Sequence, residues 1–257
     1  MTPVELDAFD SGGGGEAVIL AHAIGCDARM WQPLAPVLRD RFRVLAFDTR
    51  GHGASPVTPR PYTLGGLADD FVRALDQRGI ERAHWVGLSM GGMIGQAFAL
   101  NHPGRLARLV LANTTSSYGA GGREIWEARA KAVSEGGMAA IKDMVMARYF
   151  SEDFCATHPE IVERTGQRFL EVPAQGYVGC CDAIRDLDFT EALRNVRART
   201  LVIAGEKDAG TPVSMSQAMV DRIPGSRLAV IPGAAHLSAV EKSAEFNALV
   251  RQFLAAA

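Results

Sequence analysis

Short apolar runs alternate with longer amphipathic segments over most of the chain. Runs at 17–20, 43–47, 83–88 and 106–112 are four to seven residues long and are bounded by polar or turn residues, so we predict them as buried strands. Similar runs predict strands at 199–204 and 227–231. Apolar positions at helical spacing predict helices at 30–38, about 66–79 and 90–101. Strands that alternate with helices predict an α/β protein whose mostly parallel sheet is covered on both faces.

The middle of the chain departs from this alternation. From 115 to 188 the pattern is mostly helical, with candidate helices around 125–126, at 138–150 and at 161–170, and no clear strand. We therefore predict a helical cap at 115–188, inserted into a core domain made of 1–114 and 189–257.

Composition narrows the classes of function. The 257 residues are 47% hydrophobic and 22% charged, which suits one globular core with an insertion. The net charge of −2 makes nucleic acid an unexpected partner. The N-terminus does not read as a signal peptide, and the apolar runs are too short to cross a membrane. The cysteines form no CxxC pair, so we expect reduced thiols in a cytoplasmic protein; they are Cys26, Cys155, Cys180 and Cys181.

A candidate nucleophile lies between a predicted strand and a predicted helix. The residues Gly87-Leu88-Ser89-Met90-Gly91 match the G-x-S-x-G pattern in the strand–turn–helix setting that this motif requires. Glycines on both sides permit a sharp turn that exposes the serine hydroxyl at a helix N-terminus, where the helix dipole favours developing negative charge. The structural alternative is a serine N-cap beside two packing glycines.

A serine hydroxyl needs a base, and the base needs a partner that orients it. Of six histidines, His236 lies in a loop after the last predicted strand and follows the serine, as the order serine, acid, histidine requires. Asp208 directly follows the strand predicted at 199–204 and is the expected acid, with Glu206 as its near competitor. The structural alternative for Asp208 and His236 is a pair of loop residues without a role. The sequence thus predicts a triad of Ser89, Asp208 and His236.

Acyl transfer also needs donors for an oxyanion. We expect the backbone N–H groups of Met90 and Ile24 to fill this role, because Ile24 lies in the loop that follows the first long predicted strand. In that arrangement His22 shapes the loop rather than ionising.

Several stretches resemble the 3-oxoadipate enol-lactonases of the α/β-hydrolase superfamily along nearly the whole chain. Two strings are common to many such hydrolases: 47–55 (FDTRGHGAS) and 87–96 (GLSMGGMIGQ). Two are narrower: 175–180 (QGYVGC) and 234–238 (AAHLS). The oxyanion loop differs, because it reads HAIG at 22–25 where such lactonases often carry an NSLG-like string. The segment 115–118 (TSSY) is richer in hydroxyls than its counterpart in the family. Both segments line the expected pocket, so they bear on the substrate.

The resemblance implies an α/β-hydrolase fold and hydrolysis of an enol-lactone through an acyl-enzyme, in aromatic degradation and without a metal or organic cofactor. The substrate would be a small anion, which calls for a cation in the pocket. A cap segment at 125–129 (IWEAR) resembles a family segment and offers Trp126 and Arg129 on one helix face. Their structural alternative is a packing tryptophan and a solvated arginine.

Other functions remain open on the sequence alone. A carboxylesterase, a cofactor-free perhydrolase and a C–C bond hydrolase would use the same triad. A non-catalytic ligand receptor with the same fold would not need one, so an intact triad disfavours it.

Overall fold

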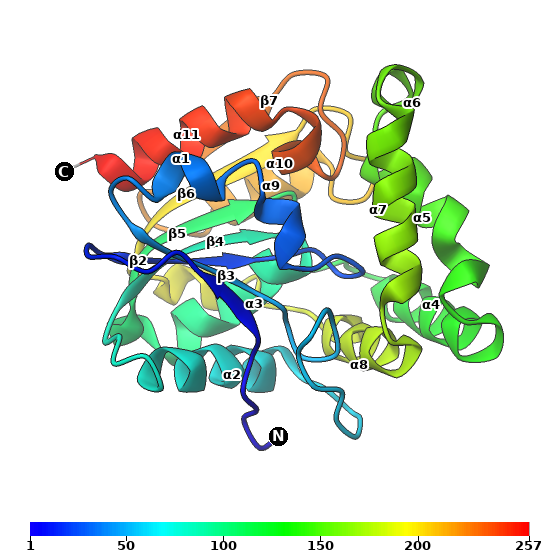
Figure 1. The fold of residues 1–257 in the computed structure, drawn as a ribbon, viewed down its shortest axis with the longest axis horizontal. Helices are drawn as coiled ribbons and strands as arrows, with labels where there is room; N and C mark the ends of the chain where they lie inside the picture. Colours follow the sequence, from blue (N-terminus) through cyan, green and yellow to red (C-terminus); the bar gives the residue numbers. More distant parts are fainter. Residues whose placement is uncertain (257) are drawn as a thin grey trace.

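The computed structural model describes residues 1–256, which form a seven-stranded sheet with helices on both faces and a group of helices at one end (Figure 1). The strand order is β1-β3-β2-β4-β5-β6-β7, and every neighbouring pair is parallel except β1 with β3. The strands are β1 (Ala8–Asp10), β2 (Ala17–Ala21), β3 (Arg43–Phe47), β4 (Ala83–Leu88), β5 (Leu106–Ala112), β6 (Arg199–Gly205) and β7 (Arg227–Ile231).

Helices cover both faces of this sheet. Helices α2 and α3 pack on one face, and α1 and α11 on the other (Figure 1). Central strands β2 and β4 are buried along their whole length, as expected of a parallel sheet between two helical layers. The α-helices are α1 (Ala35–Leu38), α2 (Leu64–Asp76), α3 (Met90–Asn101), α4 (Gly122–Gly136), α5 (Lys142–Tyr149), α6 (Glu152–Thr157), α7 (Pro159–Glu171), α8 (Ala174–Arg185), α9 (Val213–Val220), α10 (Ser238–Glu241) and α11 (Ser243–Ala255). The 3₁₀ helices are η1 (Ala28–Trp31), η2 (Pro103–Arg105), η3 (Met138–Ile141) and η4 (Ala192–Asn195).

The predicted α/β class and mostly parallel sheet are confirmed, and all six predicted strands are present to within one residue. Between β5 and β6, helices α4 to α8 gather beyond the carboxyl ends of the strands (Figure 1). Helix α4 packs along α8, and α5 contacts α7. The division of the chain into a core and a cap at 115–188 stays a prediction.

The prediction of a single helix at 30–38 was wrong. The chain forms the short helix η1, then a turn, then the single-turn helix α1. Pro33 has no N–H to donate within a continuous helix, so the pattern is interrupted there. Pro36 lies in the first turn of α1, where a missing N–H does no harm.

Several elements were not predicted. Strand β1 has only three residues and pairs antiparallel with the edge of β3. The segment predicted as one helix at 138–150 divides into η3 and α5. Helices α6, α8, α10 and α11 were missed, although α11 buries Phe246, Val250 and Phe253 at helical spacing, a signal that the sequence carries.

Candidate active site

Ser89 lies in a strained turn between β4 and α3. Its backbone has φ 55° and ψ −116°, in a region that residues other than glycine rarely adopt. The two flanking glycines make the turn possible. A Cβ on Gly87 would lie 2.2 Å from the Gly91 carbonyl oxygen, and one on Gly91 would lie 2.0 Å from the Ala21 carbonyl oxygen. The glycines of the motif are therefore required by close backbone approach.

The structure brings Ser89, His236 and Asp208 together from three separate loops. His236 Nε2 lies 2.9 Å from Ser89 Oγ, and His236 Nδ1 lies 2.8 Å from Asp208 Oδ2. All three residues are buried. The bond to Asp208 fixes the proton of a neutral imidazole on Nδ1, which leaves Nε2 free to accept the serine proton.

Asp208 is held by a dense set of donors. Its Oδ1 accepts backbone N–H groups from Gly210 at 2.8 Å and Thr211 at 3.0 Å. Its Oδ2 accepts the Thr211 hydroxyl at 2.7 Å and the Asn113 amide at 2.9 Å, besides His236. Burial alone would raise the pKa of this carboxyl, but the charge and hydrogen bond of His236, together with the other donors, hold the pKa well below its ordinary value.

This pKa shift predicts how the site contributes to stability. A carboxyl whose pKa is lowered by folding stabilises the fold above its ordinary value, here 3.8, and loses that contribution as the pH falls toward its folded value. We therefore expect wild type to melt at a higher temperature than Asp208→Asn, by a margin that does not shrink between about pH 7 and 5 and narrows below about pH 4. Thermal melts of both proteins across this range measure the margin. A margin that already narrows between pH 7 and 5 would mean that Asp208 is protonated there.

Glu206, the competing acid, lies apart from this chain of hydrogen bonds. It is exposed, and its Oε2 accepts the Gly233 N–H at 2.8 Å. Glu206 thus supports the loop that carries His236 without touching the imidazole.

Asn113 was missed by the sequence reasoning. It directly follows β5, has φ 44°, and donates its amide to both Asp208 and the Ala235 carbonyl. Its own Oδ1 accepts the Ser238 hydroxyl at 2.5 Å. An asparagine at the carboxyl end of a strand is a signal for this position, since post-strand loops gather at one edge of the sheet.

The two predicted oxyanion donors flank Ser89. Met90 begins α3, and Ile24 lies in the loop after β2. Within residues 1–256, neither backbone N–H donates to a protein acceptor. The loop is tied to α3 by the Gly91 N–H, which donates to the His22 carbonyl at 3.1 Å. Both N–H groups are thus available to a ligand beside Ser89.

Two buried histidines hold the Ile24 loop in place. His22 Nε2 accepts the Thr49 N–H at 2.9 Å, and His52 Nε2 accepts the Gly25 N–H at 3.0 Å. Burial lowers the pKa of both imidazoles, that of His52 to about 3, with the charge of His22 as a further cause there. Both rings are therefore neutral acceptors, and His22 bonds to backbone rather than to Ser89.

Tyr149, also missed from the sequence, connects the cap helix α5 to both loops. Its hydroxyl donates to the Ile24 carbonyl, and its backbone carbonyl accepts the Leu237 N–H at 2.9 Å. Its ring stacks on His236 with centroids 6.0 Å apart.

A small cavity opens beside Ser89, and we call it the Ser89 pocket. Its lining joins the two predicted cap residues to the triad and adds Arg148. The lining residues are Ile24, Ser89, Tyr118, Trp126, Arg129, Val145, Arg148, Tyr149, Gly210 and His236.

Arg129 and Arg148 give this pocket its positive charge. The guanidinium of Arg129 lies 4.7 Å from the centroid of the Trp126 ring. Within the described part of the chain, neither arginine forms an ion pair with a carboxylate. By contrast, Arg123 on the same helix as Arg129 is exposed and paired with Glu127 and Asp186. The structure thus brings both predicted cap residues to the Ser89 pocket.

Other features bear on cofactors and location. Across residues 1–256, no group of three or more His, Cys, Asp or Glu side chains could hold a metal ion. In the described residues, the four cysteines are free thiols. In the same part of the chain, no helix is both long enough and apolar enough to cross a membrane.

Comparisons with known proteins match nearly the whole chain. The model of the alpha/beta hydrolase family matches residues 18–249. The 3-oxoadipate enol-lactonase 2 of Acinetobacter baylyi is 36% identical over 90% of this chain and 85% of its own. A protein of Variovorax paradoxus with a provisional assignment as a carbamate hydrolase, RutD, is 32% identical over 94% of this chain and 92% of its own. The crystal structure of the enol-lactonase from Burkholderia xenovorans superposes with a TM-score of 0.94 at 32% identity, covering 98% of this chain and 96% of that one.

Proposed function

The chain belongs to the alpha/beta hydrolase family, and we propose that it hydrolyses an anionic lactone or carboxylic ester, with Ser89 as the nucleophile. The favoured substrate is the enol-lactone of 3-oxoadipate, in the degradation of aromatic compounds. One observation carries the choice of an anion: two arginines without a carboxylate partner line the pocket that holds Ser89. Similarity to enol-lactonases supports the lactone.

In the proposed mechanism, Ser89 Oγ attacks the carbonyl carbon of the lactone while His236 Nε2 takes the hydroxyl proton. The carbonyl oxygen becomes an oxyanion that accepts the N–H groups of Ile24 and Met90. The imidazolium formed on His236 is stabilised by Asp208, which stays a carboxylate throughout. The C–O bond of the ring then breaks, and His236 returns the proton to the leaving enolate oxygen, so the acyl group stays on Ser89.

Water completes the cycle. His236 removes a proton from a water molecule, which attacks the acyl carbon, and the second oxyanion occupies the same two N–H groups. Collapse of this intermediate breaks the acyl bond to Ser89 while His236 returns the proton to Ser89 Oγ, and the acid product loses its proton to solvent as it leaves as a carboxylate. Trp126 and Tyr149 form apolar walls on the cap side of the pocket, which limits the access of bulk water to the reacting carbon.

A comparison of substrates tests this function. We expect purified protein to open the enol-lactone of 3-oxoadipate, and to prefer it to the methyl ester of the same lactone, which has no charge on the side chain. A pH-stat follows all three reactions: the lactone and its ester release protons, whereas hydrolysis of carbamate takes up protons because the ammonia formed is protonated near neutral pH. A preference for the neutral ester would contradict the anionic substrate. Turnover of carbamate alone would move the assignment toward the RutD-like relatives.

Two further reactions use a similar triad and are checked with the same protein. Added hydrogen peroxide with a halogen acceptor would expose perhydrolase activity. Ring-cleavage dienoates would expose C–C bond hydrolysis. We expect neither to approach the rate on the lactone.

Charge recognition predicts the effect of the two pocket arginines. A hydrogen bond to a charged group is worth about 1.5–3 kcal/mol, so Arg129→Met and Arg148→Met should each lower kcat/KM for the anionic lactone roughly ten- to a hundredfold. The loss should fall mainly on KM, because the side-chain carboxylate lies away from the reacting carbonyl. Steady-state kinetics on the lactone and its methyl ester give both parameters.

The neutral methyl ester and the Arg123→Met variant are the matched controls. Arg123 shares α4 with Arg129 but is exposed and paired with Glu127 and Asp186, so its loss should change neither substrate more than about twofold. Equal losses on lactone and ester would show that Arg129 or Arg148 holds the cap in place without recognising charge.

A further inference from the structure

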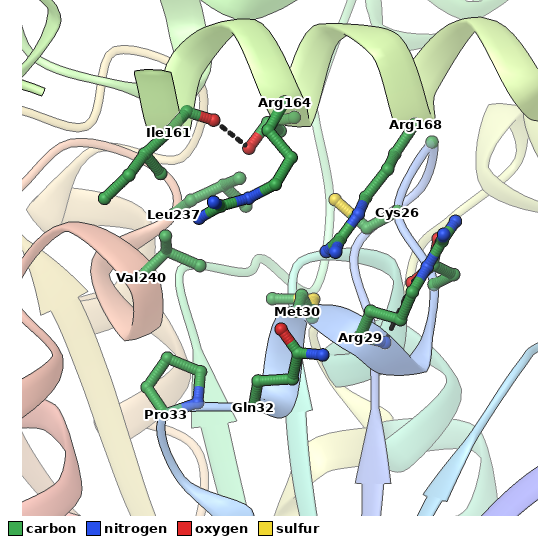
Figure 2. A pocket seen from close by; sticks show the side chains of 13 residues that line it. Cys26, Arg29, Met30, Gln32, Pro33, Ile161, Arg164, Arg168, Leu237 and Val240 are labelled. Atoms are coloured by element: carbon green, nitrogen blue, oxygen red, sulfur yellow. Dashed lines mark hydrogen bonds and ion pairs between the residues drawn. The ribbon is translucent and has the colours of Figure 1, made fainter. Parts of the chain in front are cut away.

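A second cavity lies between helix α7 and the core, next to the Ser89 pocket. We call it the α7 cavity. Figure 2 shows Arg168 extending from α7 toward Met30, which belongs to η1, and Arg164 extending from α7 toward Leu237. Val240 and Gln32 complete this part of the lining. The α7 cavity thus has cationic groups on the cap side and a mostly apolar floor.

The two α7 arginines are not neutralised by the protein. Within residues 1–256, the side chain of neither Arg164 nor Arg168 forms a hydrogen bond or ion pair with another residue. They lie four positions apart, so both project from one face of the helix. Burial lowers the pKa of Arg168, and the nearby charges of Arg29 and Arg164 lower it further, against the opposing effects of Asp27 and Glu171. An anion between the guanidinium groups would relieve this repulsion.

Two other charged groups line the α7 cavity, and they neutralise each other. Asp27 accepts three hydrogen-bond contacts from the Arg29 guanidinium, at 2.6, 3.0 and 3.0 Å, and one from the Arg29 backbone N–H. Arg29 also pairs with Glu171 at 3.1 Å, a carboxylate outside the cavity lining. With Glu171 counted, three arginines face two carboxylates, so Arg164 and Arg168 leave the cavity with a net positive charge.

From this lining we infer that the α7 cavity is a binding site for a small aliphatic carboxylate, separate from the Ser89 pocket. Guanidinium groups bind carboxylates through two parallel hydrogen bonds, so two arginines suit either both ends of a short dicarboxylate or one shared carboxylate. The apolar side chains of Met30, Leu237 and Val240 suit the carbon chain of such a ligand.

The position of the α7 cavity relates it to the proposed reaction. Gly25 and Leu237 line this cavity, while their chain neighbours Ile24 and His236 line the Ser89 pocket. The proposed ligand of the α7 cavity belongs to the class of compound that the proposed hydrolysis releases. It would contact residues that are next in the chain to the predicted oxyanion donor and to the predicted base. The inference itself goes beyond the proposed function, since binding to the α7 cavity requires no turnover.

Calorimetric titration with sodium adipate tests the site. The Ser89 pocket could also take adipate through Arg129 and Arg148, so the full-length Arg129→Met/Arg148→Met protein serves as the starting point. We expect this protein to bind adipate, and we expect the further pair Arg164→Gln/Arg168→Gln to raise Kd at least about tenfold. A change of less than twofold would overturn the proposal, as would a starting protein that binds no adipate.

The matched control removes two positive charges elsewhere. Arg41 and Arg197 are exposed and have no ion pair within the described chain, so Arg41→Gln/Arg197→Gln should leave Kd within about twofold. If adipate binding weakened equally in this control, the effect would come from the net charge of the protein, and the proposed site would be overturned. If the α7 double variant fails to fold, Gln32→Trp, which fills the exposed mouth of the cavity and keeps its charges, should weaken binding by the same order.

Two other probes define the ligand class. Hexane-1,6-diol has the same carbon chain without charge and should not bind. Inorganic phosphate should bind more weakly than adipate, because it makes no contact with the apolar floor. Phosphate that binds more tightly than adipate would contradict a carboxylate site. Because calorimetry measures binding and no hydrolysis, it tests the α7 cavity independently of the proposed function.

Discussion

Replacing Ser89 with alanine is expected to lower kcat by about 10³- to 10⁶-fold, the range over which serine hydrolases lose activity when a member of the triad is removed. The physical reason is local: Ser89 Oγ is the only group of this residue that the mechanism uses, and it lies 2.9 Å from His236 Nε2. The residual rate would come from the oxyanion donors and from binding. KM should change little, because the hydroxyl contributes mainly to the transition state.

Folding of this variant is a separate measurement. The Ser89 side chain caps no helix, so alanine removes no bond that holds the turn, and the melting temperature should stay close to that of wild type. Ser216→Ala is a matched control, since Ser216 is a buried serine in α9 whose hydroxyl has no partner within the described residues. It should keep kcat within about twofold. A Ser89→Ala protein that retained more than about a tenth of wild-type activity would remove Ser89 as the nucleophile.

The strands of the sheet could be predicted because each is a short apolar run whose burial is set locally. In a parallel sheet covered on both faces, every side chain of a central strand is buried, so β2 and β4 read as unbroken apolar runs. Strand β1 could not be found this way. It has three residues and is defined by its pairing with β3, which no local pattern encodes.

The cap was harder to predict than the core. Several of its helices are defined by contacts with one another, as α8 is by α4. The string at 175–180 resembles enol-lactonases, but its pattern predicts no helix or strand. It lies in α8, where Gly176 packs on the backbone of Gly51. A Cβ at Gly176 would lie 2.1 Å from the Gly51 carbonyl oxygen, so this contact requires glycine. Such contacts join segments more than a hundred residues apart and are invisible to periodicity.

The residues of the candidate site likewise divide into those that the sequence predicts and those that depend on long-range contacts. Ser89, Asp208 and His236 could be named because each follows a predicted strand, and loops after parallel strands meet at one edge. Asn113 also follows a predicted strand, so its place at this edge could be predicted, but its hydrogen bonds could not. Tyr149 could not be named, because its contacts depend on how the cap helix α5 approaches the loops. Arg148 was missed from the sequence as well, because its place in the Ser89 pocket depends on the orientation of α5.

Replacing Asp208 with asparagine is expected to lower kcat by about 10⁴-fold, which is the order of loss when this change is made in a serine protease triad. The donors around Asp208 explain why. At the Oδ1 position two backbone N–H groups, from Gly210 and Thr211, require an acceptor, so the amide oxygen of asparagine should take this place. The amide NH₂ then faces His236 Nδ1.

That orientation reverses the tautomer of His236. With an NH₂ donor opposite Nδ1, the imidazole must accept there and carry its proton on Nε2, which can no longer take the proton of Ser89. Steady-state kinetics should show the loss in kcat, and a structure of the variant should retain all three side chains in place. Raising the pH should restore little activity, because the wrong tautomer is neutral already.

Glu206→Gln is the matched control for this prediction. Glu206 lies two residues from Asp208 and is exposed, and glutamine can still accept the Gly233 N–H through its amide oxygen. We therefore expect kcat within about twofold of wild type, in keeping with a surface substitution that leaves its backbone contact intact. The two variants differ in one respect that matters to the mechanism: only Asp208 touches His236. If Glu206→Gln lost as much activity as Asp208→Asn, the support of the His236 loop, rather than the tautomer of its imidazole, would be the property on which turnover depends.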